Sequence, residues 1–252
     1  MSLLVKKFDY HNLKRTTIEG KRHYLDNNGK PVPSVTTVLS HLKDMTGLNK
    51  WKKRVGNQEA QRIVTESANI GTITHKHLEC FIEGVDRPTG SNLIYQQAKQ
   101  LSDIIIENGM ASVDEVWAIE QSLCFPGLYA GTADMICTYK GEPVIGDFKT
   151  SRQVKKREWV EDYFMQCAAY ALAHNEIYNT DISAGLIFIV SHSGEYQEFT
   201  VKGEEFKKYT DIHQYMSQYN RIFVFMGEGT HKIKKKAEQI ACEDAIRKLH
   251  NF

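Results

Sequence analysis

Residues 131 to 151 read GTADMICTYKGEPVIGDFKTS, and this stretch decides the fold of the chain. It predicts a β-hairpin, because an apolar run leads into the turn Lys140-Gly141-Glu142 and a second apolar run follows. Three charged residues, Asp134, Asp147 and Lys149, stand where core residues would be expected. Side chains alternate along a strand, so Asp147 and Lys149 share one face. Folding about the turn brings Asp134 to within about one residue of lying opposite Asp147.

Two carboxylates and an ammonium on one small patch favour a catalytic site. Close carboxylates repel unless a cation or a shared proton relieves them, and oxygen ligands select Mg²⁺ or Mn²⁺. Such a metal can clamp a phosphodiester and acidify water, and a lysine beside it can orient that water. The alternative is a surface hairpin on which Asp147 and Lys149 form an exposed ion pair. The upstream Gly-x-x-Asp and the apolar flanks favour the catalytic interpretation.

GTAD, then DFKTS after a hairpin, then Gln166-x-x-x-Tyr170 together resemble the PD-(D/E)XK nuclease superfamily. Within it the chain is most similar to the RecB-like branch, to its phage exonucleases and the mitochondrial genome maintenance exonucleases. The proline that names the superfamily is absent, and Gly131 and Ala133 precede the acid instead. The resemblance covers about residues 21 to 219. It implies an α/β fold with a mixed central sheet flanked by helices, the restriction-endonuclease-like core, followed here by a C-terminal helical extension.

The resemblance also implies roles for residues outside the hairpin. Gly71 and His75 have the spacing at which the branch delivers a histidine to the metal from a helix, although a lone helical histidine is more often structural. Glu120 occupies the place of a supporting glutamate, with a structural salt bridge as the equal alternative. Gln166 and Tyr170, one helical turn apart, would hold the substrate strand, with packing in the core as their alternative role. The metal ligands implied are His75, Asp134, Asp147 and the carbonyl of Phe148.

Basic and hydroxyl residues follow the Asp-x-Lys strand and predict contacts with a nucleic-acid backbone, with a solvated loop as the alternative. They are Thr150, Ser151, Arg152, Lys155 and Lys156. A second basic group, Lys234, Lys235 and Lys236, begins a helical pattern that resembles the last helix of a double-stranded RNA-binding domain. That tail could bind double-stranded nucleic acid, or it could be an amphipathic helix packed on the body.

Composition limits the remaining possibilities. The chain has 252 residues, 41% of them hydrophobic, and a formal net charge of +1, so bulk charge does not argue for nucleic-acid binding. The five cysteines are widely spaced without a Cys-x-x-Cys pair, which argues against an iron–sulfur cluster and for a reducing compartment. No apolar run has membrane-spanning length and no signal peptide is evident. A cytoplasmic protein, as in a phage- or virus-infected cell, is expected.

The chain pattern predicts a flexible lead-in over residues 1–20, a nuclease domain over 21–219 and a basic extension over 220–252. Inside the domain we expect a hairpin at 21–32, a helix capped by Ser34, and a strand at 113–125. Further helices are expected at 48–68, 71–84, 91–108, 159–177 and 204–219, with strands at 184–190 and 195–201. Gly71 is expected to open its helix and Gly84 to end it.

Together these observations predict a metal-dependent deoxyribonuclease. The expected substrate is DNA, cut by an exonuclease from single-stranded ends, in replication, recombination or repair. An endonuclease of the same fold is an alternative. A non-catalytic nucleic-acid-binding module is the alternative from another class, and an intact set of Asp134, Asp147 and Lys149 argues against it.

Overall fold

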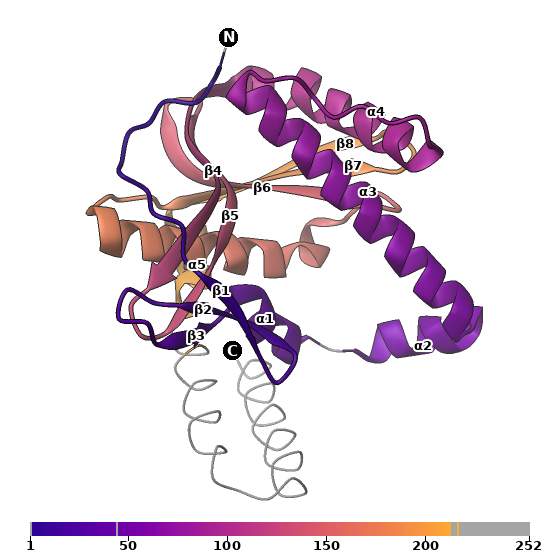
Figure 1. The fold of residues 1–252 in the computed structure, drawn as a ribbon, viewed down its shortest axis with the longest axis horizontal. Helices are drawn as coiled ribbons and strands as arrows, with labels where there is room; N and C mark the ends of the chain where they lie inside the picture. The colour runs from indigo at the N-terminus through magenta and orange to yellow at the C-terminus, as the bar shows by residue number, and fades with distance from the viewer. Residues whose placement is uncertain (1, 44, 213–215, 217–252) are drawn as a thin grey trace, which may run out of the picture.

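The computed structural model describes residues 2–43, 45–212 and 216, and shows a five-stranded mixed sheet flanked by helices (Figure 1). A separate three-stranded sheet lies near the N-terminus. The strands are β1 (Arg15–Ile18), β2 (Lys21–Leu25), β3 (Pro31–Pro33), β4 (Val113–Phe125), β5 (Tyr129–Tyr139), β6 (Glu142–Ser151), β7 (Ala184–Ser191) and β8 (Tyr196–Lys202). The helices are α1 (Val35–Leu42), α2 (Thr46–Val55), α3 (Asn57–Glu83), α4 (Leu93–Asn108), α5 (Glu161–Tyr178) and α6 (Gly203–Thr210), with short 3₁₀ turns at Met110–Ser112 and Arg157–Trp159.

The large sheet has the order β4-β5-β6-β7-β8. Strands β4, β5 and β6 form an antiparallel meander, and β7 and β8 form a second antiparallel pair. Strand β7 runs parallel to β6, so the chain must cross over between them, and helix α5 makes that crossover. All eight residues of β7 are buried, as its continuous apolar run predicts for a strand covered on both faces.

The central hairpin has the turn that its sequence predicts. Lys140 and Gly141 have φ of 51° and 83°, so a two-residue turn with left-handed backbone joins β5 to β6. The register pairs Tyr139 with Glu142 and Met135 with Gly146. One step further along this register, Asp134 is level with Asp147. The hairpin therefore brings the two carboxylates to adjacent strands, as expected.

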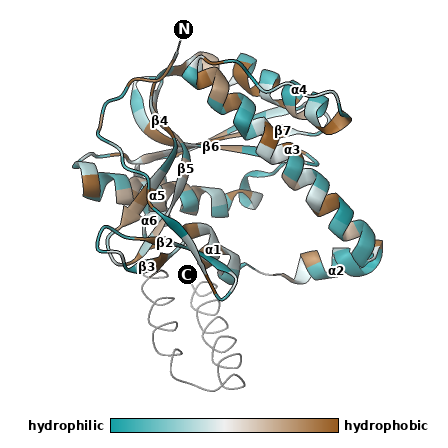
Figure 2. Ribbon diagram, viewed as in Figure 1, coloured by the Kyte–Doolittle hydropathy of each residue, from teal (hydrophilic) through white to brown (hydrophobic). Residues whose placement is uncertain are grey.

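Two hydrophobic clusters lie on the two faces of the sheet. Helices α3 and α4 cover one face and bury Ile70, Leu78, Leu101 and Ile105 there. Helices α1, α5 and α6 cover the other face and contribute residues such as Val35, Phe164 and Phe206. Figure 2 shows hydrophobic residues on α3 and α4 near the sheet, whereas α2 and the adjoining end of α3 are mostly hydrophilic. Helix α2 buries no residue at all.

The sequence predicted a helix from 48 and a second one opened by Gly71, and the structure differs. Helix α3 runs unbroken over 27 residues with Gly71 in its interior. The break falls at Gly56, whose φ of 86° no helix accommodates. A glycine inside a helix costs only about 1 kcal/mol, and burial of Ile70 and Thr74 on either side of Gly71 outweighs this. Gly84 ends the helix in a left-handed conformation, as predicted.

Residues 2–20, which the sequence predicts as a flexible lead-in, contact strand β4 at several points. The backbone of Val116 in β4 donates to the carbonyl of Leu3 at 3.0 Å, and Val5 donates back to Val116 at 2.7 Å. Further along β4, the side-chain amide of Gln121 donates to the carbonyl of His11 at 3.0 Å. The segment then forms β1, which pairs with β2. These contacts are made mainly by backbone atoms, so the pattern of polar side chains in this segment does not predict them.

Several of the other helices and strands that the sequence predicts are present in the described residues. The hairpin at 21–32 corresponds to β2 and β3, and the side chain of Ser34 accepts a hydrogen bond from the backbone of Thr37 as the cap of α1. Strand β4 has the predicted bounds. Of the helix expected at 204–219, the structure describes α6 over Gly203–Thr210, and residues 213–215 and 217–219 lie outside the described residues, as do residues 220–252 with Lys234, Lys235 and Lys236. None of the described helices combines the length and hydrophobicity that crossing a bilayer requires.

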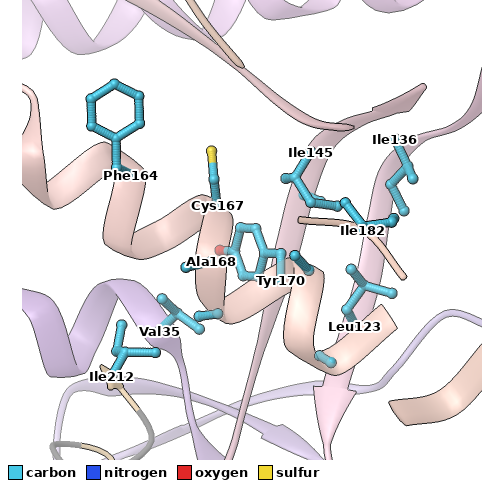
Figure 3. Close-up of a cluster of buried hydrophobic side chains, with 14 of the residues drawn as sticks. Val35, Leu123, Ile136, Ile145, Phe164, Cys167, Ala168, Tyr170, Ile182 and Ile212 are labelled. Atoms are coloured by element: carbon cyan, nitrogen blue, oxygen red, sulfur yellow. The ribbon is translucent and has the colours of Figure 1, made fainter. Parts of the chain in front are cut away.

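Gly131, the first residue of the GTAD motif, has a packing role. A Cβ atom at this position of β5 would lie 2.6 Å from the ring of Tyr170 on α5. Figure 3 shows Tyr170 among the buried side chains between α5 and the sheet. The glycine therefore lets the tyrosine ring lie directly on the strand. This contact fixes the height of α5 above β5, and with it the position of Gln166 one turn earlier in the helix.

We predict that Gly131→Ala destabilises the protein by about 1–3 kcal/mol, because the methyl group overpacks a buried ring that cannot move aside. The midpoint of urea unfolding measures the change. Gly47→Ala is the matched control: Gly47 lies in helix α2 with no atom within 4 Å of the added methyl, so this variant should be as stable as the wild type or slightly more stable. Equal midpoints for Gly131→Ala and the wild type would contradict the packing argument.

Candidate active site

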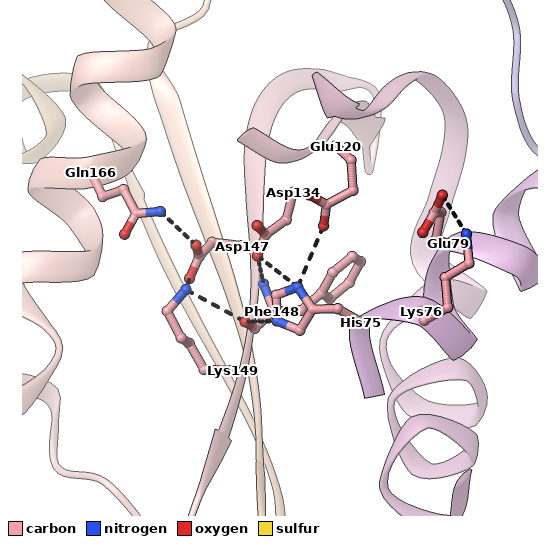
Figure 4. A network of polar contacts seen from close by, with 9 residues as sticks. All are labelled: His75, Lys76, Glu79, Glu120, Asp134, Asp147, Phe148, Lys149 and Gln166. Carbon is pink, nitrogen blue, oxygen red and sulfur yellow. Dashed lines mark hydrogen bonds and ion pairs between the residues drawn. The ribbon is translucent and has the colours of Figure 1, made fainter. Parts of the chain in front are cut away.

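His75 on helix α3 lies beside interior residues of strands β4, β5 and β6 (Figure 4). Its Nε2 is 2.9 Å from the carbonyl oxygen of Phe148 on β6, which accepts a hydrogen bond from the ring. The other ring nitrogen, Nδ1, is 3.6 Å from a carboxylate oxygen of Glu120 and 3.7 Å from one of Asp134. The imidazole is thus oriented by a backbone carbonyl and directed toward two acids.

Asp134 is nearly buried at 9% exposure, on strand β5. One of its carboxylate oxygens accepts a hydrogen bond from the backbone N–H of Phe148 at 2.9 Å. This bond continues the hairpin beyond its last paired residues, with a side chain in place of a carbonyl. On the other side, the β4–β5 register pairs Ile119 with Met135 and Gln121 with Ala133, so Glu120 is level with Asp134. The register therefore brings acids of three neighbouring strands into one row.

Glu120 has a left-handed backbone with φ of 47°, inside strand β4. A non-glycine residue in that region costs of the order of 1–3 kcal/mol and persists only where its surroundings enforce it. Its side chain is 42% exposed and contacts His75. Backbone strain of this kind concentrates at functional sites. The position of this carboxylate beside His75 and Asp134 is therefore maintained at a cost to the fold.

Asp147 and Lys149 form an ion pair on the same face of β6, as their spacing predicts. Asp147 is 2% exposed, and the amide of Gln166 on α5 donates to its Oδ1 at 3.1 Å. Lys149 also approaches the carbonyl oxygen of Phe148 at 3.5 Å and lies over the ring of Tyr163, 5.1 Å from its centre. The pair is half enclosed, not the exposed surface pair of the alternative interpretation.

The charges of the cluster shift its pKa values. Burial would lower the pKa of His75, but the charge of Asp134 and the contact with Glu120 outweigh it and raise that pKa to about 9. Burial raises the pKa of Asp147 to about 7, against the opposing effect of Lys149. Burial would also lower the pKa of Lys149, yet the charges of Asp147 and Asp134 raise it above its ordinary value. Lys149 is therefore an ammonium ion at neutral pH and acts as a fixed positive charge.

A pocket of about 210 Å³ opens onto this cluster. Asp134, His75 and Glu120 line it on one side, and Gln166 and Tyr170 of α5 line it on another. The structure thus brings both members of the Gln-x-x-x-Tyr pair to the pocket. Gln166 reaches the carboxylate of Asp147, and Tyr170 packs against Gly131. Packing is accordingly part of what the tyrosine does.

The predicted backbone-binding residues after β6 have mixed surroundings. The hydroxyl of Ser151 is buried and donates to the carbonyl of Gln153 at 2.7 Å, so it serves the turn. Thr150 is half-buried beside Gly71. Arg152 and Lys156 are exposed, whereas Lys155 is half-buried and its backbone is bonded to the side chain of Gln197. Glu79, which shares a helix face with His75, pairs with Lys76 and lies away from the cluster (Figure 4).

Two basic residues of the pocket are absent from the sequence prediction of the site. Arg15 and Arg22, from strands β1 and β2, line the same pocket as Asp134. Both lie in or beside a segment whose polar residues show no periodic pattern. The one signal in the sequence was the hairpin predicted at 21–32. Its first strand has a backbone edge with which another strand, here β1, can pair. That pairing depends on backbone atoms, which the side-chain pattern of residues 15–18 does not report.

The donor set fits a divalent metal ion. One ligand atom each from His75, Glu120 and Asp134 lies within 4.8 Å of the others, a cluster found among the described residues. Carboxylates and imidazole are both common ligands of divalent metal ions in proteins. Asp147 and the carbonyl of Phe148 lie next to this trio on β6 but are engaged by Lys149, Gln166 and His75. Glu120, for which the sequence predicts a supporting role, is thus one of the three residues of this cluster.

No family model matches the chain. The chain is 26% identical over 174 residues to mitochondrial genome maintenance exonuclease 1 of Mus musculus, in an alignment that covers 65% of this chain and 51% of that protein. The chain thus spans about half the length of the relative that it matches. Among solved structures, the crystal structure of SSO0001 is similar with a TM-score of 0.36 and 13% identity, over 72% of this chain and 74% of that chain, a likeness too low to carry an argument. The sequence similarity supports a nuclease relationship.

The strained backbone of Glu120 gives a stability prediction. We expect Glu120→Gly to melt about 2–4 °C higher than Glu120→Ala, since both remove the carboxylate but only glycine relieves about 1 kcal/mol of left-handed strain. Calorimetric melting temperatures of the two variants measure the difference. Titration with Mn²⁺ should show weaker binding in both variants. Identical melting temperatures would mean that the left-handed backbone stores no strain.

Proposed function

We propose that the protein is a Mg²⁺- or Mn²⁺-dependent deoxyribonuclease of the PD-(D/E)XK type, an exonuclease that hydrolyses DNA from single-stranded ends. The observation that carries the proposal is the row of three acids on adjacent strands, with His75 and Lys149 at its two sides. The relative matched by the sequence is named an exonuclease, which supports exonuclease over endonuclease action. The name of that relative, which refers to genome maintenance, favours a role in DNA replication, recombination or repair.

In this proposal, His75, Glu120 and Asp134 hold the metal ion, and Asp147 with the carbonyl of Phe148 completes the ligand set. When bound, the ion would supply electrophilic assistance to the phosphodiester and lower the pKa of a water molecule. The hydrogen bond from Phe148 to Asp134 and that from His75 to Phe148 orient these ligands before any metal binds. Preformed geometry of this kind reduces the reorganisation that catalysis requires.

Lys149 and the residues of α5 supply the rest of the machinery. Because Lys149 is an ammonium ion at neutral pH, it stabilises the negative charge that develops on the phosphate and orients the attacking water, and does not act as a base. Gln166 is a positioning residue, since its amide fixes the carboxylate of Asp147. Tyr170, which lines the pocket behind Gly131, bounds the space for the substrate strand.

Removal of the metal should abolish cleavage. Without a divalent ion, the electrophile is missing, and only Lys149 and His75 offset the charges of the acids. We expect no product from end-labelled single-stranded DNA in excess EDTA, and recovery on addition of Mg²⁺ or Mn²⁺. Full activity in EDTA would exclude this site as the catalytic centre. A wild-type protein that binds the strand under both conditions but never cuts it would be a nucleic-acid-binding module instead.

Lys149→Ala should lower kcat by roughly 10²-fold or more, as for the loss of one preorganised electrostatic group. Affinity for single-stranded DNA should change little, because one lysine contributes a small share of phosphate binding. Lys149→Met, which keeps the apolar stem, checks that the loss follows from the charge. The matched control is Lys202→Ala, an exposed lysine that pairs with Glu142 near the opposite end of the hairpin and should leave kcat unchanged.

The substrates are end-labelled single-stranded DNA, duplex DNA and RNA, together with a circular single strand. Short products from the labelled ends and an intact circle would support exonuclease action. Cleavage of the circle would establish an endonuclease. If Lys149→Ala cuts as fast as the wild type, Lys149 has no part in the chemistry.

A further inference from the structure

The N-terminal three-stranded sheet brings two cations to the pocket of the candidate metal cluster. Arg15 lies on β1 and Arg22 on β2, and both line the pocket of about 210 Å³ that Asp134, His75 and Glu120 also line. These arginines come from a part of the chain that the nuclease motifs do not include. Their position raises the question of what they bind.

The strand register directs both arginines to the same face. Arg15 pairs with Tyr24 and Thr17 pairs with Arg22, and residues that pair directly across an antiparallel ladder share a face. On that face the hydroxyl of Tyr24 is 3.1 Å from the hydroxyl of Thr132 on β5, two residues before Asp134. The hydrogen bond fastens this face of the small sheet against β5. The arginines are thus held at the metal cluster by a fixed sheet and not by a loop.

Neither guanidinium has a partner among residues 2–43, 45–212 and 216. No ion pair or hydrogen bond joins the side chain of Arg15 or Arg22 to another described residue, although Glu120 and Asp134 line the same pocket. Both arginines are exposed, so their guanidinium groups are open to a ligand from solvent. Two unpaired like charges directed into one pocket repel each other, and an anion between them would relieve that repulsion.

We propose that Arg15 and Arg22 bind a phosphate group of the DNA strand adjacent to the bond that is cut. This inference rests on the proposed nuclease function and adds a substrate contact to it. The forked donors of arginine match phosphate oxygens in bidentate fashion, better than a lysine does. The pocket would hold about seven water molecules at their liquid volume, enough for a phosphate with part of its sugar. The small sheet is then part of the substrate site.

A competing explanation is internal. With no metal bound, the arginines could serve only to offset the charges of Glu120 and Asp134 at long range. That role predicts no effect of the arginines on strand affinity or on its dependence on salt. A phosphate contact predicts both, because neutralising a phosphate on a single strand contributes a slope of about 0.7 to the dependence of log K on log salt concentration.

The test measures binding of a fluorescein-labelled single-stranded 12-mer by anisotropy, in EDTA so that the strand stays intact, over a series of salt concentrations. The variants are Arg15→Ala, Arg22→Ala, the double variant and Arg22→Lys. The matched control is Lys21→Ala, which removes one positive charge from the same strand β2 on its opposite face. Melting temperatures establish that each variant is folded.

We expect the double variant to bind about tenfold more weakly and its salt slope to flatten by about 0.7, because one phosphate is no longer neutralised. Arg22→Lys should keep part of the affinity, and Lys21→Ala should resemble the wild type. The same measurement on strands with a 5′-phosphate, a 3′-phosphate or neither separates two sources of the group. Loss of a preference for one phosphorylated end identifies a terminal phosphate, and equal loss on all three identifies an internal one.

An unchanged affinity and salt slope in the double variant would overturn the inference. Cleavage in Mg²⁺ distinguishes that result from failure of the proposed function. If the wild type cuts DNA and the double variant binds the strand as tightly as the wild type does, only the proposed phosphate contact is excluded. A wild type that never cuts removes the nuclease function, while the binding data still decide whether the arginines contact phosphate.

Discussion

The repulsion between Asp134 and Asp147 is the constraint on which the arrangement of the site depends. The hairpin buries both carboxylates, to 9% and 2% exposure, on adjacent strands. Four neighbouring groups contact these carboxylates: Lys149 and the amide of Gln166 contact Asp147, and His75 and the backbone N–H of Phe148 contact Asp134. The positions of helices α5 and α3 are thus set by the two hydrophobic clusters and also by polar contacts. Gln166 of α5 contacts Asp147, and His75 of α3 contacts Asp134.

Much of the fold could be predicted from the sequence, because its elements are signalled locally. Lys140-Gly141 specifies the turn, and the apolar run at 184–190 specifies a strand buried on both faces. The errors arise where distant contacts override a local signal. Gly71 suggests a helix start by its own flexibility, but the residues around it pack against the sheet cluster and keep the helix intact. Strand β1 gains its order from β2 and not from its own side chains.

The residues of the candidate site likewise fall into those that local sequence rules predict and those that they do not. Asp134, Asp147 and Lys149 could be related by strand alternation and one turn, which are properties of the sequence. His75 and Gln166 needed a resemblance, because no local rule states which helix lies over which strand. Arg15 and Arg22 could not be found by either route. They reach the pocket through a hydrogen bond between Tyr24 and Thr132, which are 108 residues apart in the chain.

Strand β4 is an edge of the large sheet, and residues 3–5 pair with it at Val116. An uncovered edge of 13 residues would present a row of free backbone donors and acceptors on which another copy of the chain could align. Residues 3–5 occupy this edge at Val116, so the backbone groups there are no longer free to pair with another chain. The opposite edge strand, β8, carries the charged residues Glu198 and Lys202, and charges on an edge strand disfavour pairing with another chain.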